Sequence, residues 1–175
     1  MNLVSIFENK TFEKRIAVTP EIAKKYIDLG FSLSLPIDYG LDLGFKDSDY
    51  KDLGVNILNN ENEILSKADI IIQLGIPDDK KLSNLKANQT LIGSLNFFSN
   101  KKKLNDLKAR KINCFSLELL PRITRAQSKD ILSSQANLAG YKAVIEAFQI
   151  YERAIPMMMT AAGTIPAAKV LVVGA

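Results

Sequence analysis

Residues 68–79, ADIIIQLGIPDD, decide the fold class of this chain. Residues 70–72 form an unbroken β-branched run after Asp69, and such a run is typical of a strand that is buried on both faces of a parallel sheet. Pro77-Asp78-Asp79 then begins a helix, because proline suits the first turn and acids suit the positive end of the helix dipole. A strand followed closely by a helix predicts a parallel α/β sheet.

The same alternation continues on both sides of this stretch. We expect strands at residues 2–7, 31–36, 55–58, 90–95 and 112–117, and helices at residues 20–30, 47–53, 61–67, 77–85 and 101–110. Thr19-Pro20-Glu21 is a clear helix start, with a hydroxyl N-cap and proline at the first helical position, and Gly30 ends that helix. The pattern predicts a doubly wound, mostly parallel sheet with helices on both faces.

A long helix is predicted over residues 129–154, where neither proline nor a strand signal interrupts the helical pattern, and Pro156 stops it. Mostly small side chains recur along it at helical spacing, and such a stripe lets another backbone approach closely: Leu132, Ala136, Ala139, Ala143 and Ala147. We therefore expect an α/β domain at residues 1–128, an interdomain helix at 129–155, and a linker with one further strand at 156–175.

The end of the chain carries a weaker signal. Residues 157–166 are expected to be irregular, with Met157, Met158 and Met159 packed beside a hinge rather than bound to a partner. Residues 169–173 form an apolar strand that Gly174 follows at once, which is how a dinucleotide-binding unit begins. An ordinary C-terminal strand is the alternative. We expect instead that the chain stops inside a second, truncated nucleotide-binding unit.

Composition excludes several kinds of site. The chain has no histidine and one cysteine, Cys114, so the common zinc ligands are missing, we expect no metal site, and no disulfide can form within the chain. A reducing compartment fits this cysteine usage. The net charge is +4, but the one run of bases, residues 101–103, lacks interleaved aromatic residues and is interpreted as a solvated helix face, with no nucleic-acid partner. No apolar run could span a bilayer, so we expect no direct membrane insertion.

The segment from Leu120 to Asp130 is the main candidate for a site. It follows a strand, and ligands of open α/β sheets bind at the carboxyl ends of strands. Arg122 offers a guanidinium, Gln127 an amide that both donates and accepts, and Asp130 a carboxylate. The alternative for Asp130 is an ordinary acid at a helix start. Four polar residues continue along one helix side, with Ser133 at its edge, although a solvent-facing stripe explains them equally: Asp130, Ser134, Asn137 and Tyr141.

The loop from Glu8 to Pro20 also follows a strand. Arg15 could contact an anion or a substrate there. A salt-bridged loop leading into a capped helix is the interpretation we favour.

Three stretches carry a resemblance to a known family. PRITRAQSKDILSSQANLAGYKAVIEAF (residues 121–148) and PMMMTAAGTIPAAKVLVVGA (residues 156–175) resemble the α subunit of proton-translocating NAD(P) transhydrogenases. ENKTFEKRIAVTP (residues 8–20) resembles the start of the wider superfamily that includes alanine dehydrogenases. The resemblance covers essentially the whole chain and is weaker between about residues 32 and 113. It implies a Rossmann-like or flavodoxin-like fold.

The resemblance also implies a function and a site. In that family two α/β domains hold NAD(H) in a cleft, the unit is a homodimer, and a hydride passes directly to or from NADP(H) on another component, coupled to proton movement. The family's loop triad maps onto Arg122, Gln127 and Asp130. Ile123, Thr124, Ser133 and Gly174 would line the nucleotide site. Through partner components, the protein would lie on the cytoplasmic side of the inner (plasma) membrane.

Two other functions remain open. An alanine dehydrogenase needs a positioned acid or base at its substrate, and by alignment of the flanking strands the lysine and histidine of that family are replaced by Gly75 and Asn96. Hydride exchange between two nicotinamides needs ring alignment and no proton transfer at the reacting carbons, so a chain without histidine fits transhydrogenation better. A non-catalytic module that binds a partner through the alanine-rich helix is the third possibility. We also expect residues 1–175 alone to bind little NADH, since most of a glycine-rich loop is missing.

Overall fold

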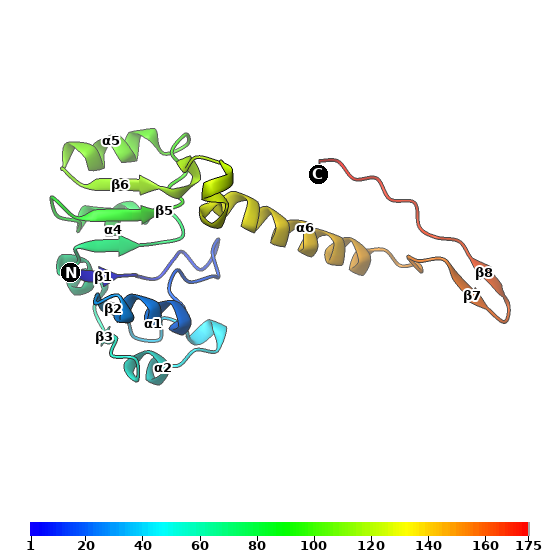
Figure 1. Ribbon diagram of the computed structural model, residues 1–175, viewed down its shortest axis with the longest axis horizontal. Helices are drawn as coiled ribbons and strands as arrows, with labels where there is room; N and C mark the ends of the chain where they lie inside the picture. Colours follow the sequence, from blue (N-terminus) through cyan, green and yellow to red (C-terminus); the bar gives the residue numbers. More distant parts are fainter. Residues whose placement is uncertain (175) are drawn as a thin grey trace. The chain divides into compact units, whose positions relative to one another are not determined.

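The computed structural model describes residues 1–174 and divides the chain into two compact units, residues 1–126 and residues from 127 onward. The first unit contains a six-stranded sheet (Figure 1). Its strands are β1 (Asn2–Val4), β2 (Ser32–Pro36), β3 (Asn56–Leu58), β4 (Ile70–Ile72), β5 (Thr90–Gly93) and β6 (Asn113–Ser116). Its helices are α1 (Pro20–Asp28), α2 (Asp47–Lys51), α3 (Glu61–Ser66), α4 (Asp79–Ser83) and α5 (Lys101–Ala109), with 3-10 turns η1 (Leu41–Leu43) and η2 (Leu117–Leu119).

The strand order is β3-β2-β1-β4-β5-β6, and all five neighbouring pairs are parallel. The first three strands therefore extend in one direction from β1 and the last three extend in the other from β4. The order reverses between β1 and β4, which makes that gap the topological switch point of the sheet. The predicted doubly wound parallel α/β fold is confirmed.

Two apolar clusters cover the two faces of the sheet. Leu3 and Val4 are neighbours on β1, and because strand side chains alternate, they enter different clusters. Leu3 packs with Ala23 of α1 and Tyr50 of α2, whereas Val4 packs with residues of α3, α4 and α5. Ile71 and Leu91 in central strands are fully buried in the same cluster as Val4, where their apolar surface is removed from water.

β1 is shorter than predicted, because side chains replace strand pairing after Ser5, whose N–H still donates to the carbonyl of Ser34 at 3.4 Å. The backbone N–H of Ile6 donates to Oε1 of Gln73 at 2.9 Å, and the N–H of Phe7 donates to Oε1 of Glu61 at 2.8 Å. Both donors are thus satisfied without a neighbouring strand. The exit of β1 is consequently held by Gln73, which directly follows β4, and by Glu61 of α3.

The second unit contains the long helix α6 (Ile131–Ile150) and a two-stranded antiparallel sheet, β7 (Met158–Thr160) and β8 (Gly163–Ile165), while the 3-10 turn η3 (Thr124–Lys129) spans the boundary between the units. The predicted long helix is confirmed, but it ends at Ile150, before the expected residue 154, with Tyr151 extended. The expectation that residues 157–166 are irregular was wrong, because a turn at Ala161 and Ala162 joins two paired strands.

The predicted strand at residues 169–173 is also wrong. These residues lie in a stretch without regular structure, and four of their side chains are at least 71% exposed: Val170, Leu171, Val172 and Val173. A β-branched run does not form a strand by itself, since a strand requires ladder hydrogen bonds to a neighbour. No described residue supplies that neighbour to residues 169–174.

Candidate functional site

The predicted site segment begins at the carboxyl end of β6, as expected. After η2, residues 120–123 lead into η3, and Asp130 follows as the N-cap of α6. Arg122, Ile123 and Thr124 are exposed, and Ile123 is 57% exposed although it is apolar. Gln127 is exposed as well. The segment therefore presents a cation, an amide and an apolar side chain on the surface.

Asp130 has a clear structural role. Its Oδ1 accepts from the N–H of Ser133 at 3.0 Å and its Oδ2 accepts from the Ser133 hydroxyl at 2.7 Å. A carboxylate in this position caps the helix and faces the positive end of its dipole. Asp130 is thus the acidic residue at the start of α6, and Ser133 is fixed beside it.

The segment is divided between the two units. Arg122, Ile123 and Thr124 belong to the first unit, and Gln127, Asp130 and Ser133 belong to the second. Contacts link these residues within each unit: the N–H of Ala126 donates to the carbonyl of Ile123 at 2.8 Å, and the N–H of Asp130 donates to the carbonyl of Gln127 at 3.1 Å. Gly174 is exposed and has a φ of +85°, a conformation that glycine adopts without strain.

The polar side of α6 is exposed at Ser134, Asn137 and Tyr141. The helix has no buried residue, and its apolar side chains are exposed too, with Leu138 at 59% and Phe148 at 46%. The polar stripe is therefore not distinguished from the rest of the helix by its accessibility.

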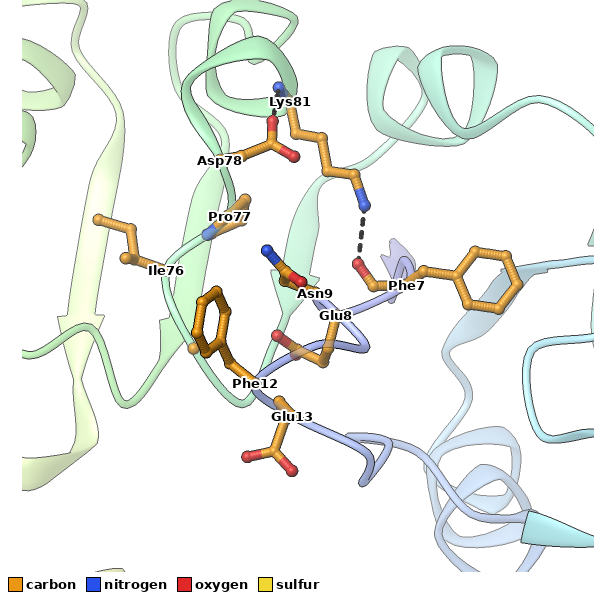
Figure 2. A pocket seen from close by; sticks show the side chains of 10 residues that line it. Phe7, Glu8, Asn9, Phe12, Glu13, Ile76, Pro77, Asp78 and Lys81 are labelled. Atoms are coloured by element: carbon orange, nitrogen blue, oxygen red, sulfur yellow. Dashed lines mark hydrogen bonds between the residues drawn. The ribbon is translucent and has the colours of Figure 1, made fainter. Parts of the chain in front are cut away.

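A pocket of about 470 Å³ lies at the topological switch point (Figure 2). Figure 2 shows that its lining comes from two segments: Glu8, Asn9, Phe12 and Glu13 from the loop after β1, and Ile76, Pro77, Asp78 and Lys81 from the β4–α4 connection and α4. Sequence reasoning named the loop from Glu8 to Pro20, which supplies part of this lining, but it favoured a salt-bridged loop there and placed the main site candidate after β6. The available signal was the polar Gln73 directly after the apolar run of β4.

Glu8 connects the two loops that line the pocket. Its Oε1 accepts from the N–H of Leu74 at 2.6 Å and from Nε2 of Gln73 at 3.1 Å. Burial raises the pKa of Glu8 above its usual value, and backbone hydrogen bonds from Leu74 and Gly75 act against that rise. A carboxylate that accepts from a peptide N–H and from a side-chain amide has a fixed position.

A second set of contacts fixes the backbone at Phe7. Nζ of Lys81 donates to the carbonyl of Phe7 at 2.7 Å and pairs with Oε2 of Glu61 at 3.2 Å. Since Oε1 of Glu61 accepts from the N–H of Phe7, both backbone polar groups of Phe7 are held. The charges of Lys81 and Glu61 offset each other.

A buried polar network continues from Glu8 into the domain. Oε1 of Gln73 accepts from the Ser5 hydroxyl at 2.9 Å, and that hydroxyl lies 2.7 Å from the hydroxyl of Tyr39. The Tyr39 oxygen also accepts from the N–H groups of Ala17 at 3.1 Å and Val18 at 3.4 Å. Burial raises the pKa of Tyr39 to about 12. The two ends of the loop after β1 are therefore tied together through neutral buried groups.

Arg15 is paired as the salt-bridged-loop interpretation predicts. Its Nε and one terminal nitrogen donate to the carboxylate of Glu13 at 2.8 Å and 2.6 Å. These bonds lower the pKa of Glu13. Among residues 1–174, no group of three or more histidine, cysteine, aspartate or glutamate side chains is arranged to hold a metal ion.

Comparison with known proteins identifies the family. The model of the "Alanine dehydrogenase/PNT, N-terminal domain" family matches residues 6–139. The chain belongs to this family. Its α/β unit, with the pocket at the switch point and the segment after β6, is therefore the N-terminal domain type of the alanine dehydrogenase/PNT family.

Within the family, the transhydrogenase side is more similar than the alanine dehydrogenase side. The chain is 42% identical to an NAD(P) transhydrogenase subunit alpha protein from Rickettsia prowazekii, covering 99% of this chain and 46% of that protein. A transhydrogenase structure from Sinorhizobium meliloti matches with a TM-score of 0.86 and 39% identity, covering 95% of this chain and 50% of that one. Alanine dehydrogenase 1 from Staphylococcus aureus is 26% identical over 83% of this chain and 38% of that protein. The predicted resemblance to transhydrogenase α subunits is confirmed.

The chain spans about half the length of the transhydrogenase relatives that it matches. No helix among the described residues is both long enough and apolar enough to cross a bilayer.

Proposed function

We propose that this chain is part of the NAD(H)-binding component of a proton-translocating NAD(P) transhydrogenase. The observation that carries the proposal is the 42% identity to a transhydrogenase α subunit protein over 99% of the chain. The absence of histidine from the sequence supports it, because direct hydride exchange requires ring alignment and no acid or base at the reacting carbons.

The residues after β6 fit the nicotinamide end of NAD(H). Arg122 and Gln127 are exposed on the segment that leaves the carboxyl end of the sheet, where open α/β folds bind ligands. A guanidinium can donate to a phosphate or carboxamide oxygen, and an amide can both donate and accept, so the donor set matches that end of the nucleotide. Ile123 and Thr124 would provide an apolar and a hydroxyl contact beside them.

Each residue then has a distinct task. Bound NADH supplies the hydride. Arg122 holds the nucleotide electrostatically, and Gln127 bridges the two nucleotides by hydrogen bonds. Asp130 acts through the segment, because its carboxylate caps α6 and holds Ser133. Gly174 would contact the nucleotide at the start of the second nucleotide-binding unit.

The same proposal names partners. NADP(H) would be bound by another component, and a membrane component would couple hydride transfer to proton movement. The protein would act as a homodimer on the cytoplasmic side of the membrane, held there by these partners. The domain boundaries proposed are an α/β domain at residues 1–128, an interdomain helix at 129–155, and the beginning of a second unit at 156–175.

The test is Gln127→Leu in the assembled enzyme, with Gln149→Leu on the exposed side of α6 as the matched control. We expect the rate of hydride transfer from NADH to an NADP⁺ analogue to fall about 100-fold or more, because the group that positions the two rings is lost. The Kd for NADH should change about threefold or less. The control should retain its rate. Unchanged turnover in Gln127→Leu would refute the positioning role, and alanine-dependent reduction of NAD by the enzyme would favour an amino-acid dehydrogenase instead.

We also propose that residues 1–175 alone bind NADH weakly. A pyrophosphate is bound by the whole G-x-G-x-x-G pattern and the helix that follows it, and Gly174 supplies one glycine of that pattern. Calorimetry of this chain with NADH should show no binding in the micromolar range. A micromolar Kd would contradict the proposal.

A further inference from the structure

Helix α5 and the two residues after it carry the net positive charge of the chain. Residues 101–111 contain six lysine or arginine residues and one acid, Asp106, which gives this segment a charge of +5. The whole chain has a net charge of +4, so all its other residues together carry −1. Such an asymmetry is typical of a surface that contacts a polyanion.

One side of α5 uses its basic residues within the domain. Lys103 pairs with Asp79 of α4 at 2.8 Å. Arg110 donates to the carbonyls of Leu82 at 2.8 Å and Ser83 at 3.1 Å, near the end of α4. Lys103 and Arg110 are seven positions apart, so they lie on the same side of the helix. This side contacts α4 and is not available to a partner.

The other basic residues lie elsewhere on the helix. Lys101 and Lys108 each precede a residue of the α4 side by two positions, and since a helix turns about 100° per residue, they lie roughly 200° around its axis. In the first unit α5 lies next to β6, the edge strand of the sheet (Figure 1). Four exposed lysines have no acidic partner among residues 1–174: Lys101, Lys102, Lys108 and Lys111.

Two phenyl rings precede these lysines in the β5–α5 loop. Phe98 is 72% exposed, and its ring meets that of Phe97 edge to face at 5.4 Å between centroids. Nζ of Lys101 lies 6.0 Å from the centroid of the Phe98 ring. Phe98 therefore places an exposed apolar side chain beside the unpaired positive charges.

We propose that a basic surface made of Phe98, Lys101, Lys102, Lys108 and Lys111 binds the anionic surface of a phospholipid bilayer without crossing it. Clusters of about four to eight lysine or arginine residues on an amphipathic helix are typical of segments that bind anionic lipids. A phenyl ring adds a contact at the boundary between headgroups and acyl chains. A nucleic acid fits less well, because the two rings contact each other and do not alternate with the lysines. This surface does not depend on the proposed transhydrogenase function.

The test is co-sedimentation of the 175-residue chain with phospholipid vesicles. We expect binding to phosphatidylcholine vesicles that contain about one third phosphatidylglycerol, and no binding to vesicles of phosphatidylcholine alone. Salt screens charges at a surface, so about 0.5 M NaCl should release the bound chain.

A triple lysine variant removes the charge of the basic surface. Each basic residue near an anionic bilayer contributes about fivefold to binding, so replacing three lysines should weaken binding about 20-fold or more. The matched control removes three exposed lysines near α1 and α2 and should weaken binding about threefold or less. Both variants should keep the circular dichroism spectrum of the unsubstituted chain, because all six side chains are exposed. The test variant is Lys101→Gln with Lys102→Gln and Lys108→Gln, and the control is Lys24→Gln with Lys46→Gln and Lys51→Gln.

Phe98→Ala tests the apolar contact and should weaken vesicle binding about threefold or more. Phe12→Ala removes another exposed phenyl ring, outside the basic surface, and should leave vesicle binding unchanged. Equal binding by Phe98→Ala and the unsubstituted chain would overturn the role of the phenyl ring. The proposal as a whole is overturned if the chain does not bind anionic vesicles, if both lysine triples weaken binding equally, or if the chain binds a single-stranded oligonucleotide more tightly than the vesicles.

Discussion

Replacing Tyr39 with phenylalanine tests whether buried hydrogen bonds hold the loop after β1. Tyr39 is 3% exposed, and its ring contacts Tyr50 at 6.3 Å and Phe7 at 6.1 Å between centroids. Phenylalanine retains those ring contacts. It removes the oxygen that accepts from Ala17 and Val18, and Val18 is fully buried.

The expected loss of stability follows from these bonds. A buried N–H left without an acceptor costs about 1–3 kcal/mol. Ser5 retains its hydrogen bond to Gln73, so the loss of its contact with the Tyr39 hydroxyl should cost less stability. We expect Tyr39→Phe to lower the free energy of unfolding by about 2–3 kcal/mol. Urea denaturation followed by circular dichroism measures this change. Tyr26→Phe is the control, since Tyr26 is half-buried and its hydroxyl has no hydrogen bond to any of residues 1–174.

The same substitution changes the dependence of stability on alkaline pH. A tyrosine in the unfolded chain ionises near pH 10, whereas burial raises the pKa of Tyr39 to about 12. The unfolded state therefore loses its proton first, so the stability that the neutral hydroxyl contributes is complete below pH 10 and is lost as pH rises towards 12. In Tyr39→Phe the free energy of unfolding should fall less steeply with pH in this range, and the difference in slope should correspond to one proton. A free energy of unfolding within about 0.5 kcal/mol of the unsubstituted chain at pH 7, together with an unchanged slope, would refute the reasoning.

Further predictions concern a close backbone contact and an ion pair. Gly93→Ala should destabilise the domain by about 2 kcal/mol or more in thermal unfolding, because a Cβ there would overlap the carbonyl oxygen of Gln73. Gly75→Ala is the control and should lower the stability by less than about 1 kcal/mol. An equal effect of the two substitutions would contradict this prediction. Glu13→Gln should flatten the acid side of the stability profile. The bonds from Arg15 lower the pKa of Glu13, so its contribution is present above pH 4.5 and is lost as pH falls through the lowered value. Urea denaturation at a series of pH values from neutral to acid measures this profile. If Glu13→Gln and the unsubstituted chain gave the same profile, the Glu13–Arg15 pair would not contribute to stability.

Local sequence signals predicted most of the first unit. Thr19 and Asp78 were identified from residue type alone as helix-start residues, and each caps a helix, with Asp78 accepting from the N–H of Lys81 at 2.8 Å. The apolar run of β4 was found because side chains buried on both faces of a parallel sheet must be continuous in sequence. These features depend on neighbouring residues, so the sequence contains them directly.

Features that depend on distant residues were not predicted. Glu8 and Leu74 are 66 positions apart, and Phe7 and Glu61 are 54 apart, so nothing in the sequence marks these polar side chains as partners. The strand expected at residues 169–173 was wrong for the same reason, because strand formation depends on a neighbour that β-propensity does not specify. The segment from Arg122 to Asp130 was placed correctly after β6, and its role in nucleotide binding stays a prediction.

The central position of β1 has a consequence for how the domain folds. β1 is the first strand in the chain, yet it pairs with β2 on one side and with β4 on the other. During synthesis the second edge of β1 stays unpaired until residues 70–72 are available. The carbonyl of Phe7 gains its hydrogen bond only when Lys81 is available. Contacts over such separations require closure of long loops, which slows folding. The switch-point pocket should thus form late, after about half of these 175 residues have emerged from the ribosome.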